Sequence, residues 1–202
     1  MNEIITTFIF FFAVIDPVGT IPVFIAVTKS CEAKKKNKIA VKAVIAAAIV
    51  LMFFLVAGEV ILNAINVPLS AFQIAGGIVL FLFALTMIFG ESKPDEEINE
   101  INKESEKSIF PLAIPSIASP GAMIAAVMLT ENSLYGIWDQ LKISIIMLSV
   151  LLITLIFLLL SSKLFKIIGN NGASIISRVM GLILASVAVT SVLEGIKLYF
   201  EI

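Results

Sequence analysis

The sequence predicts an all-α membrane protein with six transmembrane helices, and three observations lead to this fold class. Of the 202 residues, 59% are hydrophobic and the mean hydropathy is +1.09, which is more apolar than a soluble domain of this length requires. Six apolar stretches are each long enough to cross about 30 Å of hydrocarbon as a helix. The short alternating strands of a membrane barrel are absent, and irregular backbone facing lipid is unfavourable, so the spans are expected to be helices.

The predicted spans lie near residues 4–28, 39–62, 68–90, 109–130, 141–160 and 174–198. The first span begins without a basic segment before it and is long enough to cross the membrane, so no cleavable signal peptide is expected. A polar stretch separates the third and fourth spans. We therefore expect a first three-helix repeat over 1–90, a polar cytoplasmic linker over 91–108, and a second three-helix repeat over 109–202.

Basic residues set the predicted orientation. All but two of the 14 Lys and Arg residues, Lys142 and Lys197, lie on one side of the predicted topology. The positive-inside rule makes that side cytoplasmic, so both termini are expected on the extracytoplasmic side of a cell (inner) membrane. Because each half has an odd number of spans, the second half is expected to insert with inverted topology.

A related motif occurs once in each half, in the middle of the first and fourth spans. The first copy reads Ile15-Asp16-Pro17-Val18-Gly19-Thr20-Ile21-Pro22, and the second reads Pro115-Ser116-Ile117-Ala118-Ser119-Pro120-Gly121-Ala122. Asp or Ser followed by Pro is typical of a helix start. The motif therefore predicts first and fourth helices broken at mid-membrane. The alternatives are that the prolines only kink continuous helices, and that the two halves resemble each other by chance.

The predicted breaks have a chemistry suited to a zwitterion. We expect the Asp16 carboxylate to accept from the amide of Val18 or Gly19, and the Ser119 hydroxyl to accept from that of Gly121 or Ala122. The remaining free amides, at the positive ends of helix dipoles, suit a carboxylate, whereas Asp16 suits an ammonium group or another cation. The candidate substrate-binding residues are Asp16, Pro17, Val18, Gly19, Thr20, Ser119, Pro120, Gly121 and Ala122.

Four residues in the third and sixth spans are candidates for a gate or for support: Gln73, Gly76, Arg178 and Gly181. Gln73 and Arg178 each precede a small-residue pattern by one turn. The default interpretation of such glycines is close helix packing, and Arg178 is expected to extend toward water at the cytoplasmic end. Near the opposite end of the sixth span, the polar residues Thr190 and Ser191 are candidates to line an outer vestibule, and the alternative is that their hydroxyls bond the backbone of their own helix.

At these residues the chain resembles the MarC family of integral membrane proteins. The resemblance rests on Asp16-Pro17 with Gly19 and Pro22, on Ser119-Pro120-Gly121-Ala122, and on Arg178 before Gly181. The chain departs from the family pattern at Gln73, where a basic residue is usual. The resemblance implies a six-span inner-membrane protein. It also implies a function, because some members are described as transporters of small neutral amino acids such as glycine and alanine.

The sequence thus predicts a secondary transporter of small neutral amino acids, driven by an ion gradient. No cofactor is expected beyond a coupling proton or sodium ion, and the partners are the amino acid and the lipid bilayer. The absence of His, the single Cys and the net charge of −1 argue against an enzyme, a Cys/His metal site and a nucleic-acid partner. The alternatives are a channel or ion transporter that uses Asp16, and a non-transporting membrane protein. The sequence leaves the oligomeric state open.

Overall fold

The computed structural model describes residues 2–29, 31–89, 112–129 and 136–200, and throughout these ranges the regular secondary structure is helical. The helices are α1 (Asn2–Ile15), α2 (Thr20–Val27), α3 (Ala33–Ala64), α4 (Leu69–Phe89), a short π-helical segment η1 (Leu112–Ile117), α6 (Pro120–Met128), α7 (Ile137–Leu159) and α8 (Ser161–Phe200). The prediction of an all-α protein is therefore confirmed.

Five helical segments are long and apolar enough to cross a membrane: Ile4–Val27, Ala33–Gly58, Ser70–Phe89, Trp138–Leu159 and Ser161–Phe200. They correspond to the first, second, third, fifth and sixth predicted spans. The described part of the fourth predicted span forms two short helices, η1 and α6, and neither is long enough to cross alone. The six-helix repeat therefore stays a prediction, as does the linker at 91–108, which lies outside the described residues.

Two helices extend further than the sequence predicted. Helix α3 begins at Ala33, so Lys34 and its basic neighbours lie in its first turns and not in a loop. Lysine favours helices, and its long side chain can carry the charge to water from the end of a span. Helix α8 begins at Ser161 and bends at Gly169, whose φ of 63° and ψ of 178° suit glycine alone. Lys163 and Lys166 are therefore helical as well.

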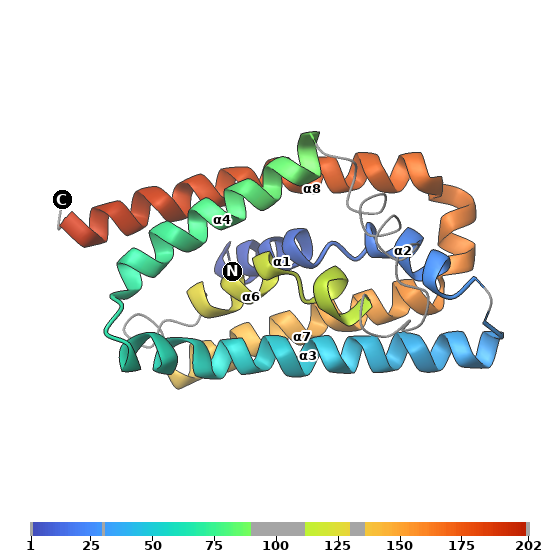
Figure 1. Cartoon of the computed structure of the whole chain (residues 1–202), viewed down its shortest axis with the longest axis horizontal. Helices are drawn as coiled ribbons and strands as arrows, with labels where there is room; N and C mark the ends of the chain where they lie inside the picture. The colour runs from blue at the N-terminus through green and yellow to red at the C-terminus, as the bar shows by residue number, and fades with distance from the viewer. Residues whose placement is uncertain (1, 30, 90–111, 130–135, 201–202) are drawn as a thin grey trace.

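The helices form three layers (Figure 1). Helices α4 and α8 pack side by side in one outer layer, α3 and α7 pack together in the other, and α1, α2 and α6 lie between them. Within each outer pair the two helices run in opposite directions, and α1 and α6 do the same in the middle layer. This arrangement brings the first broken segment, α1 and α2, next to the second, η1 and α6.

The middle layer is enclosed by protein. Of the most apolar stretch of the first candidate span, 78% is buried, against 28–39% in the other four spans. The outer helices instead expose large apolar side chains such as Ile49 and Val56, each 66% exposed, as expected for surfaces that face lipid. A polar group between Ala13 and Phe24, where every residue is buried, is consequently surrounded by protein and must find its partners there.

Candidate functional site

The first break separates α1 from α2 at residues 16–19. Asp16 has a φ of 49°, an uncommon backbone conformation that Asp tolerates better than most residues, and only 1% of it is exposed. Its Oδ1 accepts a hydrogen bond of 3.0 Å from the amide of Gly19, as the sequence predicted. The helix itself starts later than predicted, at Thr20 and not at Pro17, because residues 16–19 form a turn. The amide of Thr20 donates to the Asp16 carbonyl at 3.1 Å.

Ser177 of α8 is the second partner of the Asp16 carboxylate. Its hydroxyl donates to Asp16 Oδ2 at 2.6 Å, and the serine is fully buried. Both carboxylate oxygens thus accept a hydrogen bond from the protein. Sequence reasoning missed Ser177 because it lies 161 positions away from Asp16. The only sequence signal was a small polar residue next to Arg178 in a predicted membrane span.

The second break separates η1 from α6. Ser119 has extended backbone, with φ −68° and ψ 158°, and serves as the N-cap of α6 with Pro120 in the first turn. Its hydroxyl accepts from the amide of Ala122 at 3.1 Å, and the Ser119 carbonyl accepts from the amide of Met123 at 3.0 Å. The predicted start of a helix at Ser119-Pro120 is confirmed, and both breaks rule out continuous helices that are merely kinked.

The two breaks share their hydrogen-bond pattern. In each, the side chain of the first residue (Asp16 or Ser119) accepts from the amide three positions later, and its carbonyl accepts from the amide four positions later. The amides of Val18 and Gly121, each two positions after the first residue of its break, take no part in this pattern. Neither amide has a hydrogen-bond partner among the described residues. In the described part of the chain, each break therefore has one amide donor without an acceptor.

The breaks also contact each other. The Ser119 hydroxyl, which accepts from its own helix, donates to the carbonyl of Val14 in the last turn of α1 at 3.2 Å. Ser119 is 1% exposed, so this contact lies in the enclosed middle layer. The structure thus brings together Asp16, Ser119 and Ser177 from three separate parts of the chain.

The candidate glycines lie where backbones approach closely. A Cβ on Gly19 would collide with the Asp16 carboxylate and lie 2.6 Å from Ser177 Oγ. A Cβ on Gly121 would lie 3.0 Å from Phe83 of α4, and one on Gly76 would lie 2.8 Å from Ile124 of α6. The contact of Gly76 agrees with close helix packing, the default interpretation for the third span. Gly19 and Gly121, predicted as substrate-binding residues, also face protein atoms.

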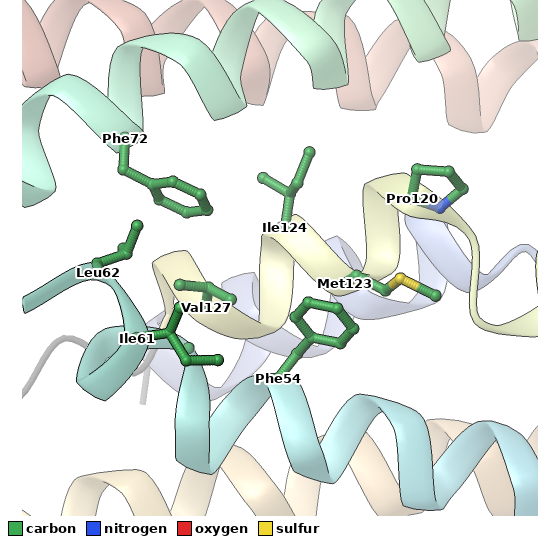
Figure 2. A pocket seen from close by; sticks show the side chains of 9 residues that line it. Phe54, Ile61, Leu62, Phe72, Pro120, Met123, Ile124 and Val127 are labelled. Atoms are coloured by element: carbon green, nitrogen blue, oxygen red, sulfur yellow. The ribbon is translucent and has the colours of Figure 1, made fainter. Parts of the chain in front are cut away.

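An apolar cavity of about 280 Å³ lies beside the second break, between α3, α4 and α6. Figure 2 shows Phe54 of α3 and Phe72 of α4 pointing into it from opposite sides, with Met123 and Ile124 of α6 between them. Pro120 borders this cavity and is exposed, whereas Pro17 at the first break is buried. The two breaks therefore differ in their surroundings although their hydrogen bonds match.

A second cavity, of about 260 Å³, lies between α1, α4, α8 and the end of α6, and we call it the polar cavity. It is lined by Thr6, Thr7, Phe10, Gln73, Met128, Leu129, Val187, Thr190, Ser191 and Glu194. It lies at the end of the bundle where both termini lie (Figure 1). The sequence suggested that Thr190 and Ser191 line an outer vestibule, and both residues line this cavity.

Gln73 and Arg178, predicted to be equivalent, have different environments. Gln73 lines the polar cavity and is half-buried, and its Oε1 atom has no hydrogen-bond partner in the described part of the chain. Arg178 is exposed on α8, which agrees with a side chain extending toward water. Gly181 is buried against α4, where an added Cβ would lie 3.1 Å from the carbonyl oxygen of Ala84.

Comparison with known proteins identifies the class of this helical membrane protein. The model of the MarC family integral membrane proteins matches residues 1–200, and the chain belongs to this family. A UPF0056 membrane protein of Buchnera aphidicola subsp. Schizaphis graminum is 37% identical, with all of both chains covered. The UPF0056 inner membrane protein YhgN of Escherichia coli strain K12 is 33% identical over the full length of both. No solved structure matches the chain significantly.

A third relative matches about as well as these two. The UPF0056 membrane protein of Methanocaldococcus jannaschii is 36% identical, with 98% of this chain and 97% of the relative covered. None of these names states an activity. The family confirms an integral membrane protein, and any more specific function has to be argued from the site.

Proposed function

We propose that this protein is a secondary transporter of small neutral amino acids of the glycine and alanine class. The observation that carries the proposal is the meeting of two helix breaks, each with a free amide, beside a buried carboxylate. Free amides at helix starts suit the carboxylate of an amino acid, and Asp16 suits its ammonium group. Broken helices that meet inside a membrane bundle are typical of substrate sites in transporters.

Helix contacts support the inverted repeat that such a transporter uses. A Cβ on Gly77 of α4 would lie 2.9 Å from the carbonyl oxygen of Ala188 on α8. Gly181 of α8 makes the reciprocal contact with the Ala84 carbonyl of α4. Gly181 follows Gly77 in the sequence by the same number of residues as Ala188 follows Ala84. The two contacts are therefore equivalent, as an internal two-fold axis between α4 and α8 requires.

This shift changes the expected equivalence of residues. The sequence comparison paired Gln73 with Arg178, but the glycine contacts pair Gln73 with the preceding residue, Ser177. Gln73 lines the polar cavity without a partner for its Oε1, whereas Ser177 is buried on Asp16. The position in the first half, Gln73, thus opens to a cavity, whereas the equivalent position in the second half, Ser177, is closed by its contact with Asp16.

This difference between the halves suggests alternating access. Transporters built from inverted repeats expose a fixed site to one side at a time as one part of the protein moves against the other. The described basic residues at the starts of α3 and α8 lie at the end of the bundle opposite the termini. We therefore assign that end to the cytoplasm and both termini to the outside of a cell membrane.

Transport by the purified protein tests the proposal. Protein in liposomes is offered labelled glycine or alanine under an imposed proton or sodium gradient, and we expect accumulation with at least one gradient. Absence of uptake and of exchange under every gradient would refute transport of these solutes. The gradient that drives accumulation identifies the coupling ion.

Asp16→Asn tests the assigned residue. The amide keeps the shape and can still accept a hydrogen bond, but it loses the charge, so we expect uptake to fall at least about tenfold, as for the loss of one charged hydrogen bond. Asp139→Asn is the matched control, because Asp139 is an exposed acid paired with Lys142 at the start of α7. Equal uptake by the two variants would remove Asp16 from this role.

A further inference from the structure

Two of the hydroxyl groups that line the polar cavity already donate to their own helix. The hydroxyl of Thr190 donates to the carbonyl of Ser186 at 3.0 Å, and that of Ser191 donates to the carbonyl of Val187 at 3.1 Å. Each hydroxyl has only one proton, so these two side chains keep only acceptor lone pairs for a ligand.

Two further acceptors share this lining. Gln73 Oε1 is buried without a partner among the described residues, which is unfavourable for an amide oxygen unless a ligand or water pairs with it. Glu194 lies on the α8 wall, one turn after Thr190 and Ser191. None of the described residues that line the cavity is basic. This part of the lining thus combines a carboxylate, an amide group and hydroxyl groups, and it carries no positive charge.

We propose that the polar cavity binds a small cation, either the ammonium group of the transported amino acid or a monovalent metal ion. Both are satisfied by oxygen acceptors together with one negative charge. Met128, at the end of α6, lines the cavity, and Ser119 caps the start of the same helix. The cavity and the second break therefore lie at opposite ends of α6. That the cation belongs to the transported amino acid rests on the proposed function. Binding of a cation in the cavity does not itself require transport.

Thermal unfolding of the purified protein in detergent tests this site. A ligand that binds only the folded state raises the melting temperature. Sodium chloride and methylammonium chloride are titrated separately against choline chloride at constant ionic strength, and glycine is titrated in choline chloride. We expect sodium or methylammonium to raise the melting temperature with a saturable dependence on concentration. Sodium alone would identify a metal ion, and methylammonium together with glycine would identify the substrate ammonium.

Variants of the two acceptors locate the binding. Glu194→Gln and Gln73→Leu are each expected to raise the half-maximal cation concentration, for Glu194→Gln by about tenfold or more because a charged partner is lost. Glu32→Gln is the matched control, since Glu32 is an exposed acid at the other end of the bundle, between α2 and α3. Each variant is compared with its own choline baseline, so a change in folding does not obscure the cation effect.

The results separate this inference from the proposed function. If neither cation stabilises the wild type, or if both variants respond as the wild type does, the cation site is refuted. If the cation shift depends on Glu194 but the protein moves no amino acid in liposomes, the site stands and the proposed function fails. If transport occurs and Glu194→Gln leaves both uptake and the shift unchanged, the proposed function stands and the site fails.

Discussion

Ser177→Ala tests whether the buried hydrogen bond to Asp16 holds the first break closed. The variant removes a donor at 2.6 Å from Asp16 Oδ2 and leaves that oxygen in a site where Asp16 is only 1% exposed. A hydrogen bond to a charged group contributes about 1.5–3 kcal/mol to stability. A protein of this size loses about 2–4 °C in melting temperature per kcal/mol. We therefore expect the melting temperature to fall by roughly 3–12 °C.

Ser186→Ala is the matched control for this prediction. Ser186 lies on the same helix, is exposed, and donates only to the carbonyl of Leu182 in its own helix at 3.1 Å. Its replacement is expected to change stability by less than about 0.5 kcal/mol, as for most surface substitutions. The measurement is thermal unfolding of both variants in the same detergent. A loss in Ser177→Ala no larger than in Ser186→Ala would refute the reasoning.

A double-mutant cycle then assigns the effect to the pair. Asp16→Asn, Ser177→Ala and the double variant are unfolded under the same conditions. Residues that share a hydrogen bond show coupling of about 0.5–3 kcal/mol, whereas independent sites are additive. Additive losses would mean that Ser177 stabilises α8 for a reason unrelated to Asp16.

Three further variants test other contacts of the site. Gly19→Ala places a Cβ 2.6 Å from Ser177 Oγ and against the carboxylate, so we expect the free energy of unfolding to fall by about 1–3 kcal/mol. Gly136→Ala, whose Cβ would have one neighbour among the described atoms, at 3.9 Å, should be neutral in the same assay. Ser119→Ala removes the N-cap of α6 and should cost about 0.5–2 kcal/mol, and an unchanged melting temperature would contradict the cap. Gly181→Ala forces a Cβ to 3.1 Å from the α4 backbone and should lower the free energy of unfolding by about 1–3 kcal/mol. An unchanged free energy of unfolding would contradict this, because it would mean that the two helices separate without loss of stability.

The breaks could be predicted from sequence because their causes are local. Proline removes a backbone donor and fixes φ, and Asp or Ser beside it can cap the next helix. These effects act within four residues, so the motifs at Asp16 and Ser119 were enough to locate both breaks. The exact start of α2 was not predicted, because the positive φ of Asp16 inserts a turn before the helix and no residue pattern requires it.

The partners of the breaks could not be predicted in the same way. The contact between Ser177 and Asp16 joins residues from opposite ends of the chain, and it depends on the rotation of α8 about its axis. A shift of one residue would have put Arg178 there instead. The sequence comparison placed the proposed repeat one residue away from the register that the glycine contacts favour, because apolar segments resemble each other in many registers. The close approach of Gly77 to Ala188 is one of the contacts that favour the second register.

The chemical difference between the two breaks has a structural reason. Ser119 must accept from its own helix and also donate to the Val14 carbonyl at 3.2 Å, which a carboxylate cannot do because it has no proton to donate. Asp16 must accept from Gly19 and from Ser177 with two separate oxygens, which suits a carboxylate. The side chains at the two breaks are therefore not interchangeable, although the backbone hydrogen bonds around them are. If the two halves exchange conformations during transport, the bond from Ser177 to Asp16 must open without an identical bond forming in the other half. The Gln73 amide, at the position equivalent to Ser177, is the group left to compensate for it.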